Sequence, residues 1–416
     1  MKASILTIGD ELLIGQVIDT NSAWLADKLT TLGFEVTKIL SISDNPEAIA
    51  TSVNELMAQS NLTISTGGLG PTSDDRTKQT LCDLFGGELK LHLPSLNLIE
   101  QLFQKRGLPL TETNRGQALI PSSCTPILNY HGTAPGMIFQ KGDNYLISLP
   151  GVPFEMKSLF TESVEPFIKQ KFSLPAIVRV TVNTFGIPES FLSDKLTAFE
   201  EFLKSNDIAL AYLPSPSGIR LRLTAKGKAI DKEKLENTLD LAIRELNGLI
   251  GENIIGFNDE LLPVVVSNAL RGKQATLALA ESCTGGYISH IITQVPGSSD
   301  IFKGGVVAYS NVIKQTVLGV NQELLANYGA VSRQVVDAML DGALKVFQSD
   351  YAIAVSGIAG PTGDSPDKPV GTTWIGVASK SQRNIELFTF GNLRDINIQR
   401  AANTALHQLL KLMKQE

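Results

Sequence analysis

A short polar segment carries side chains that suit amide hydrolysis. Residues Ala280–Gly286 read AESCTGG; they follow an apolar run typical of a buried strand and precede a helical pattern. A side chain at such a turn is exposed, and the unpaired N–H groups of the helix start surround it. Amide hydrolysis requires a nucleophile, a base and donors for the developing oxyanion. Ser282 is the candidate nucleophile, and the N–H groups near Thr284 and Gly285 are candidate oxyanion donors.

Two other interpretations of this segment stay open. A serine or threonine before a helix is a common cap, so the segment also fits a structural cap followed by a glycine turn. Cys283 is the alternative nucleophile, although small buried cysteines contribute to packing more often than to chemistry. We expect its side chain to point away from that of Ser282.

The base that would activate Ser282 is expected at a second strand-to-helix junction. Lys314 lies in the first turn of a helix that follows a predicted strand, near the same sheet edge. A lysine is usually a solvated charge, and burial or a neighbouring cation must lower its pKa from about 10.4 before it acts as a base. Ser–Lys pairs are a known variant of triad chemistry. His290 is the alternative base; it lies about two turns along the next helix and is expected to face elsewhere.

A third segment, Ser356–Gly363, reads SGIAGPTG and follows another predicted strand. Its glycines allow the backbone to approach a phosphate closely. Arg394 and Arg400 lie on the predicted last helix, and their guanidinium groups are suited to bind phosphate through two hydrogen bonds. Arginines on a terminal helix are otherwise mostly surface charges, so this assignment depends on the rest of the site.

The N-terminal part has its own candidate site at Thr66–Asp75, which reads TGGLGPTSDD. Backbone N–H groups of such a glycine nest hold phosphate oxygens, and the two final carboxylates suit Mg²⁺, which prefers oxygen ligands. The segment is neither a P-loop nor a GxGxxG motif, because no lysine follows it and the glycine spacing differs. It also fits a plain strand-to-helix turn with Asp74 or Asp75 in the first helical turn, where the helix dipole favours anions.

The candidate segments lie in the N-terminal and C-terminal parts of the chain, where strand and helix patterns alternate. Such alternation implies parallel sheets covered on both faces, with ligands beyond the carboxyl ends of the strands, where the candidate loops fall. The N-terminal part has predicted strands at Ser4–Ile8, Leu62–Ser65 and Tyr145–Leu149, and predicted helices at Ser22–Gly33, capped by Thr20 or Asn21, and at Pro46–Gln59. From Glu260 onward, helices are predicted at Leu261–Arg271, Gly286–Thr293, Ser332–Phe347 and Arg394–Met413, strands at Ala275–Ala280, Gly305–Tyr309 and Tyr351–Val355, and a hairpin at Trp374–Ala378 and Ile385–Phe390.

A smaller α+β unit is predicted between these two α/β parts. It comprises strands at Ile177–Asn183 and Ile219–Thr224, helices at Glu189–Leu203 and Lys232–Leu246, and an outgoing linker at Gly251–Asn258. Gly248–Gly251 has the GxxG spacing of an RNA-binding loop, which needs basic neighbours, but it lies beside Glu245 and Glu252. We interpret it as a helix stop. The predicted domains are therefore residues 1–170, 171–255 and 256–416.

Composition narrows the functional classes. The chain has 416 residues, of which 43% are hydrophobic and 19% charged, and this balance is typical of folded domains. Its formal net charge of −6 lacks the basic footprint of a nucleic-acid binder. Three distant cysteines without a CxxC pair argue against a disulfide framework or zinc site and favour a reducing compartment. No signal-peptide core and no apolar run of about 20 residues is present, so we expect a soluble, cytoplasmic protein with no membrane partner.

The C-terminal motifs, taken together, are similar to a known family. The matching stretches are Glu281–Gly286, Phe302–Asn311 with Lys314, Gly329–Ser332, Ser356–Gly363 and Lys368–Trp374. They resemble the C-terminal domain of the CinA family, whose stand-alone form is nicotinamide mononucleotide deamidase (PncC). The resemblance implies hydrolysis of the carboxamide of nicotinamide mononucleotide to nicotinic acid mononucleotide and ammonia, with no cofactor in this domain. It implies Ser282 as nucleophile and Lys314 as its partner. The implied substrate-binding residues are Thr284, Gly285, Asn311, Ile358, Gly360, Thr373 and Arg400.

The N-terminal motifs resemble the molybdopterin-binding (MoaB/MogA-like) fold in its CinA version. The glycine loop is accompanied by Gly9–Gly15, Asp19–Asn21, Asn114–Ala118 and Pro150–Met156. In CinA proteins this domain is associated with metal-dependent ADP-ribose pyrophosphatase activity, which implies attack of water on a Mg²⁺-bound diphosphate. The implied phosphate- or nucleotide-binding residues are Asn21, Gly67, Gly68, Gly70, Thr72, Asn114 and Gly151, and the implied metal ligands are Asp75, Asp74 and Asp44.

The middle segment resembles the KH-like domain of CinA proteins, and we favour a structural or dimer-forming role for it. The family resemblance implies a homodimer acting on small nucleotides, and we do not expect a nucleic-acid partner. Two alternatives stay open: a non-catalytic protein associated with competence or DNA repair, and a molybdopterin-binding protein that uses only the N-terminal site. The acidic net charge counts against direct DNA contact but not against a protein partner.

Overall fold

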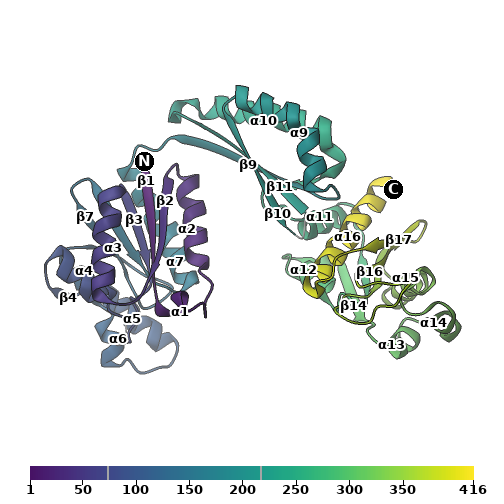
Figure 1. Ribbon diagram of the computed structural model, residues 1–416. Coiled ribbons are helices and arrows are strands. Elements are labelled where there is room, and N and C mark those ends of the chain that lie inside the picture. The colour runs from purple at the N-terminus through teal and green to yellow at the C-terminus, as the bar shows by residue number, and fades with distance from the viewer. Residues whose placement is uncertain (73–74, 216–217) are drawn as a thin grey trace. The chain divides into compact units, whose positions relative to one another are not determined.

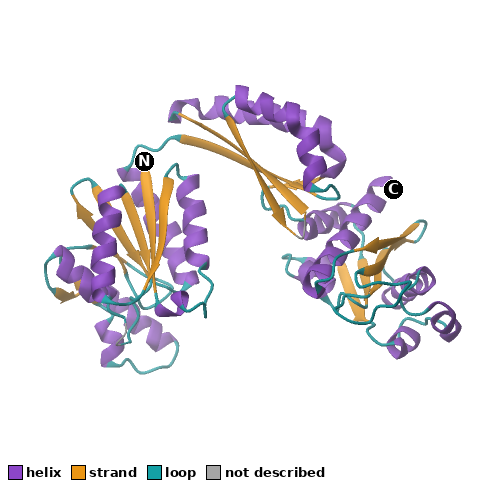
Figure 2. Ribbon diagram, viewed as in Figure 1, coloured by secondary structure: helices purple, strands orange, loops and turns teal. Residues whose placement is uncertain are grey.

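The computed structural model describes residues 1–72, 75–215 and 218–416, and the chain divides into two compact units. The first unit contains residues 1–177 and 226–233, and the second contains residues 178–225 and 234–416. Figure 1 labels the elements of both units, and Figure 2 distinguishes their helices from their strands. Within the described part of the chain, none of the helices combines the length and apolar character that crossing a bilayer requires.

A six-stranded sheet in the order β2-β1-β3-β8-β7-β6 forms the centre of the first unit. Its strands are β1 (Lys2–Ile8), β2 (Glu35–Ile42), β3 (Leu62–Thr66), β6 (Thr125–Ile127), β7 (Gly136–Lys141) and β8 (Asn144–Leu149). The pairs β1–β2, β1–β3 and β3–β8 are parallel, whereas β7 pairs antiparallel with β6 and with β8. The sheet is therefore mixed rather than wholly parallel, but the four parallel strands still end at one shared edge.

Helices cover both faces of this sheet (Figure 1). Successive residues of β1 point to opposite faces, so Ile5 packs in one apolar cluster with α2 and α7, whereas Leu6 packs in another with α3. The helices are α1 (Asp10–Leu13), α2 (Thr20–Thr31), α3 (Pro46–Gln59), α4 (Thr77–Phe85), α5 (Leu93–Lys105), α6 (Glu112–Gly116), α7 (Pro153–Leu159) and α8 (Glu165–Lys171), with a π-helical turn at Phe160–Val164. A two-stranded sheet joins β4 (Leu89–Leu91) and β5 (Leu119–Pro121).

The α+β part contains a four-stranded sheet in the order β10-β11-β9-β12. Its strands are β9 (Ala176–Thr184), β10 (Ile208–Ser215), β11 (Gly218–Gly227) and β12 (Ile254–Phe257), and its helices are α9 (Glu189–Ser205) and α10 (Lys232–Ile250). Short 3-10 turns lie at Ala229–Asp231 and Gly251–Asn253. Leu196 of α9 and Leu246 of α10 pack with Leu221 of β11 in one apolar cluster, which agrees with the predicted α+β character.

A five-stranded sheet in the order β14-β13-β15-β16-β17 forms the C-terminal part of the second unit. Its strands are β13 (Leu277–Glu281), β14 (Phe302–Val307), β15 (Tyr351–Gly357), β16 (Thr372–Ser379) and β17 (Arg383–Thr389). Strands β14, β13 and β15 are parallel, and β16 and β17 form the predicted antiparallel hairpin at the other end. The turns that follow β13, β14 and β15 therefore meet at one edge.

Two apolar clusters lie on opposite faces of this sheet. Leu279 of β13 packs with α11 and α16, and its neighbour Ala280 packs with α15. The helices are α11 (Leu262–Gly272), α12 (Tyr287–Thr293), α13 (Asn311–Thr316), α14 (Gln322–Tyr328), α15 (Arg333–Phe347) and α16 (Arg394–Gln415), with a 3-10 turn at Ser298–Asp300. The strand–helix order predicted from the sequence is confirmed for this part.

Two local predictions are wrong, and the structure gives the reason for each. Asp19, rather than Thr20 or Asn21, caps α2, because its carboxylate accepts the Ser22 N–H at 2.9 Å. The predicted linker Gly251–Asn258 contains strand β12, which pairs antiparallel with β9 and extends the sheet. Four residues with a central glycine are too short to show an alternating pattern.

Candidate functional site

Ser282 and Lys314 meet at the carboxyl edge of the C-terminal sheet. Ser282 directly follows β13, and Lys314 lies in α13 after β14, its parallel neighbour. The Lys314 Nζ atom donates to Ser282 Oγ at 3.1 Å and to the Ala308 carbonyl oxygen at 2.6 Å. The lysine is 1% exposed and the serine 9% exposed. The two side chains that the sequence places 32 positions apart are thus within hydrogen-bonding distance.

The environment of Lys314 makes its amine easier to deprotonate. Burial disfavours the charged form and lowers the pKa of Lys314 below its ordinary 10.5; the nearby Cys283 thiol opposes this only in part. Its recorded polar partners are a hydroxyl and a carbonyl rather than a carboxylate. A buried lysine without a balancing anion is suited to hold and release a proton.

The alternative nucleophile and base are less suited to the chemistry. Burial raises the pKa of the Cys283 thiol to about 12, and its side chain belongs to the apolar cluster under α11 and α16. A thiol that stays protonated is a weak nucleophile. His290 is exposed and does not line the cavity that contains Ser282; its Nε2 atom lies 3.2 Å from Nε2 of Gln294, the residue that follows α12.

A cavity of about 260 Å³ opens over the Ser282–Lys314 pair. It is lined by Ser282, Cys283, Tyr309, Lys314, Ala330, Val331, Ser356, Gly357, Ile358, Ala359, Gly360, Thr362, Gly363 and Arg394. The glycine loop after β15 forms one wall, and positive φ angles of 89° and 95° at Gly360 and Gly363 require glycine there. Predicted substrate contacts Ile358 and Gly360 therefore face the candidate site.

The last helix contributes Arg394, the first residue of α16, rather than Arg400. The Arg394 guanidinium donates to the Gly360 carbonyl oxygen and to the Tyr309 hydroxyl, both at 2.9 Å. Arg400 is exposed, does not line the cavity, and lies six positions later on another side of the helix. The structure thus brings Arg394 to the site, whereas the family resemblance implied Arg400. Tyr309, at the end of the β14 segment, was not predicted.

Several other predicted substrate contacts do not line the cavity. Asn311 is the exposed first residue of α13, and Thr373 is buried on β16 with its hydroxyl on the Gly371 carbonyl oxygen. The Gly285 N–H, a predicted oxyanion donor, is already bonded to the Ser282 carbonyl oxygen at 3.1 Å. The Thr284 side chain is buried and its hydroxyl has no partner among the described residues.

A second cavity, of about 330 Å³, lies at the carboxyl edge of the N-terminal sheet. Gly67 has φ 111°, and a Cβ there would lie 2.0 Å from the Ile8 carbonyl oxygen, so only glycine fits this turn. The predicted residues Asn21, Gly67, Gly68, Gly70 and Gly151 all line the cavity. The Asn21 side-chain amide donates a hydrogen bond to the Gly151 carbonyl oxygen at 2.7 Å. This bond connects two segments that line the cavity.

Carboxylates gather at the rim of this N-terminal cavity. Asp44 and Asp75 line it together with Glu11. The pKa of Asp44 is raised above its ordinary value, first by burial and then by the nearby charges of Asp10, Glu11 and Asp75, although the Asp10 N–H opposes the shift. Among the residues that the structure describes, no group of three or more His, Cys, Asp or Glu side chains is arranged to hold a metal ion by itself.

The remaining N-terminal predictions fall outside the cavity or outside the described residues. The Thr72 N–H and hydroxyl both donate to Asp75 Oδ2, so Thr72 orients that carboxylate without lining the cavity. Asn114 lies on α6, away from the lining, and accepts a hydrogen bond from Thr111. Asp74, the third predicted metal ligand, lies outside the described residues.

Three family models match successive segments of the chain. "Probable molybdopterin binding domain" matches residues 4–170, "Damage-inducible protein CinA KH domain" matches residues 179–256, and "CinA C-terminal domain" matches residues 259–413. The matches agree with the mixed α/β architecture and the α+β part between the two larger sheets.

Relatives align with this chain over nearly their whole length. A CinA-like protein of Flavobacterium psychrophilum is 43% identical over 99% of this chain and 98% of its own length, and one of Cytophaga hutchinsonii is 40% identical over the same shares. Among solved structures, the competence/damage inducible protein CihA from Agrobacterium tumefaciens is 35% identical; the match covers 36% of this chain and 93% of that chain, with a TM-score of 0.36. This chain belongs to the CinA family.

Proposed function

We propose that the C-terminal part hydrolyses the carboxamide of nicotinamide mononucleotide to nicotinic acid mononucleotide and ammonia. One observation carries the proposal: a buried lysine, with no carboxylate partner among the described residues, lies 3.1 Å from the hydroxyl of a serine that lines the same cavity. The family resemblance supplies the substrate, because the motifs that hold this pair match those of the deamidase branch.

In the acylation step, the neutral Lys314 amine takes the Ser282 hydroxyl proton while Oγ attacks the carboxamide carbon. The N–H groups of Cys283 and Thr284 bond to no other residue among those described, which leaves them free to receive the developing oxyanion. Collapse of the tetrahedral intermediate breaks the C–N bond. The Lys314 ammonium group gives its proton to the leaving nitrogen, which departs as ammonia.

The second half of the reaction releases the acid. A water molecule gives a proton to Lys314 and attacks the Ser282 ester carbon, and the returning Lys314 proton restores the serine hydroxyl. The product is nicotinic acid mononucleotide. The same lysine thus acts as base and acid in each half-reaction, so the reaction requires no metal or organic cofactor in this domain.

The cavity suits a small nucleotide. Its volume of about 260 Å³ lies near the lower end of small-molecule sites, which start at roughly 300 Å³. Arg394 lines the cavity beside the glycine loop. Its guanidinium would receive the 5′-phosphate together with the N–H groups of Gly360 and Gly363, which have no partner among the described residues. This arrangement places the phosphate at the edge and the reactive amide near the buried pair.

The test is an ammonia-release assay on the purified full chain with nicotinamide mononucleotide, with and without EDTA. We expect turnover that EDTA does not change, and product with the mass of nicotinic acid mononucleotide. Absence of ammonia release, or release that depends on a divalent cation, would contradict the proposal. Absence of turnover would favour the non-catalytic alternative.

We propose, as a second activity, that the N-terminal part hydrolyses the diphosphate of ADP-ribose with Mg²⁺. The supporting observation is the acidic rim, where neighbouring negative charges contribute to the raised pKa of Asp44. Mg²⁺ is commonly held by one or two carboxylates together with substrate phosphates, so Asp44 and Asp75 fit a cation shared with substrate. Such a cation neutralises phosphate charge and activates water. The glycine turn would hold the phosphate oxygens through its N–H groups.

The N-terminal proposal is tested with ADP-ribose and Mg²⁺, followed by identification of AMP and ribose 5-phosphate. We expect hydrolysis that EDTA abolishes. Retention of a pterin through purification, without ADP-ribose turnover, would instead support the molybdopterin-binding alternative.

A further inference from the structure

We propose that Glu281 is a positioning residue for Ser282, an inference that rests on the proposed amide hydrolysis. Glu281 is the last residue of β13 and immediately precedes the candidate nucleophile. It is 1% exposed. A buried carboxylate is costly unless hydrogen bonds replace its water shell, so the contacts that it makes indicate what it holds in place.

Four hydrogen bonds converge on the Glu281 carboxylate, and all come from the start of α12. Oε2 accepts the Gly286 N–H at 3.1 Å and the Ile288 N–H at 3.0 Å. Oε1 accepts the Ser289 N–H at 2.8 Å and the Ser289 hydroxyl at 2.6 Å. These four hydrogen bonds connect the end of β13 to the first turn of α12, so the chain between them forms a closed loop.

The segment within this closed loop is the candidate catalytic turn itself. Residues 282–285 span the gap between the carboxylate and its first donor, Gly286. Within the turn, the Ser282 N–H is fixed to the Val355 carbonyl oxygen of β15 and the Ser282 carbonyl accepts the Gly285 N–H. With these contacts in place, the Ser282 hydroxyl accepts the hydrogen bond from Lys314, and the N–H groups of Cys283 and Thr284 have no partner within the described part of the chain. The carboxylate also occupies N–H groups of the helix start that would otherwise compete for the substrate anion.

The contacts require a carboxylate rather than any polar side chain. Every partner of Glu281 is a donor in the observed geometry, and an ionised carboxylate only accepts. A glutamine of the same shape would place its NH₂ group against N–H groups. The turn would then shift to relieve that contact, and a displacement of about 1 Å at a reacting atom costs on the order of 100-fold in rate.

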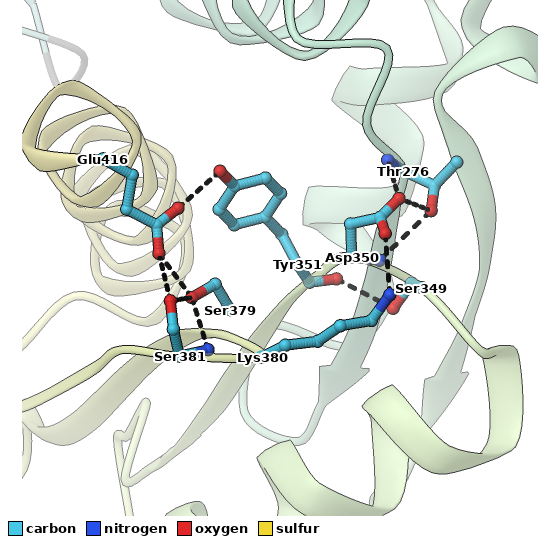
Figure 3. A network of polar contacts seen from close by, with 8 residues as sticks. All are labelled: Thr276, Ser349, Asp350, Tyr351, Ser379, Lys380, Ser381 and Glu416. Atoms are coloured by element: carbon cyan, nitrogen blue, oxygen red, sulfur yellow. Dashed lines mark hydrogen bonds and ion pairs between the residues drawn. The ribbon is translucent and has the colours of Figure 1, made fainter.

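Asp350 immediately precedes the neighbouring strand β15, beside the amino end of β13, and offers a matched control. Its carboxylate accepts the N–H and the hydroxyl of Thr276 at 2.9 and 2.8 Å, just before β13 begins (Figure 3). Asp350 therefore joins neighbouring segments as Glu281 does, but it lies at the amino end of β13, and the cavity lies at the carboxyl end. A purely structural effect of losing such a carboxylate would appear in both variants.

The experiment compares E281Q and D350N with the wild-type full chain in three measurements. These are kcat and KM for nicotinamide mononucleotide, the rate at which a fluorophosphonate labels Ser282, and the thermal unfolding midpoint. For E281Q we expect kcat to fall about 100-fold with KM changed less than about threefold, and labelling to slow in parallel. D350N should lose stability and keep both rates. Unchanged kcat and labelling in E281Q, or equal losses in D350N, would overturn the proposal.

The labelling measurement distinguishes a failure of the Glu281 proposal from a failure of the proposed amide hydrolysis. Wild type that labels at Ser282 but releases no ammonia would refute the deamidase proposal and still allow the positioning role to be tested by the labelling rates. Wild type that does not label would overturn the positioning role, because Ser282 would not be activated.

If E281Q does not fold, S289A tests the contact between Ser289 and Glu281 with a smaller change. It removes only the hydroxyl that donates to Glu281 at 2.6 Å, and we expect kcat and labelling to fall about three- to tenfold. T293V is its control, because the partners of the Thr293 hydroxyl among the described residues are the Ser289 and His290 carbonyl oxygens of the same helix. Wild-type rates in S289A would overturn the proposal.

Discussion

The two candidate sites lie at equivalent edges of two mixed sheets but treat charge in opposite ways. The C-terminal site buries the amine of Lys314, which donates hydrogen bonds to a hydroxyl and a carbonyl oxygen. The N-terminal site gathers carboxylates around a glycine turn. In both, burial is the largest cause of a pKa shift, and it lowers the pKa of Lys314 and raises that of Asp44. Burial favours the neutral form of both groups. The proposed amide hydrolysis needs neutral Lys314, whereas the proposed cation site needs ionised Asp44.

The same edge of a sheet thus carries two different sets of side chains, and each set is suited to a different chemistry. A neutral amine beside a hydroxyl is suited to covalent catalysis without a metal. Crowded carboxylates beside a phosphate-binding turn instead call for a divalent cation. Because the two sites lie in separate compact units, changes in one are expected to leave the other active, and each of the following predictions uses that independence.

The largest effect is expected for K314M, which keeps the side-chain volume and removes the base. Ammonia release should fall by roughly 10³-fold or more, since the nucleophile and its base act as a unit. ADP-ribose hydrolysis by the same sample should be unchanged, and an unfolding midpoint close to that of wild type serves as the folding control. K368M removes a lysine that bonds to the Tyr328 carbonyl oxygen and does not line the cavity; an equal loss in that variant would contradict the assignment.

For the N-terminal site, D75N should lower ADP-ribose hydrolysis by about 100-fold, because it weakens the cation site. Ammonia release should be unaffected. D83N, on the exposed side of α4, is the matched control and should keep both activities. A D75N protein with full Mg²⁺-dependent activity would remove Asp75 from the site.

Arg394 and Arg400 provide a comparison within the C-terminal site. R394A should raise the KM for nicotinamide mononucleotide about 10- to 100-fold, as expected for the loss of charged hydrogen bonds to a phosphate. R400A should behave as wild type in the same steady-state assay. A raised KM in R400A with a wild-type KM in R394A would instead assign phosphate binding to Arg400, as the family resemblance implied.

The two sites should also differ in their pH dependence. Lys314 must be neutral to accept a proton, so kcat/KM for ammonia release should fall about tenfold per pH unit below its pKa, which lies below 10.5. Asp44 must be ionised, so ADP-ribose hydrolysis should persist to lower pH and fall only through its pKa, which lies above 3.8. Identical acid limits for both activities would contradict this difference.

The smallest effect is expected for E416Q, outside both sites. The Glu416 carboxylate accepts hydrogen bonds from Ser379 and Tyr351, which lower its pKa (Figure 3). A depressed pKa stabilises the fold above the ordinary pKa and loses that effect as pH falls through the lowered value. Calorimetry should show a loss of about 1–3 °C at neutral pH that disappears in acid, with both activities unchanged.

Much of this arrangement could be predicted from the sequence, because it depends on order along the chain. Ser282 and Lys314 follow neighbouring parallel strands, and such ends share an edge. Other features depend on contacts that order does not determine. Strand β12 is too short to show a period. The choice between Arg394 and Arg400 depends on which side of α16 contacts the glycine loop, and the four bonds to Glu281 require the turn to fold back on its strand.

The most direct test of the account is the rate of ammonia release by S282A at saturating nicotinamide mononucleotide, with ADP-ribose hydrolysis measured on the same sample. The account predicts that ammonia release falls by roughly 10³-fold or more while the ADP-ribose reaction is unchanged. Ammonia release within tenfold of wild type, from a folded S282A protein, would contradict it.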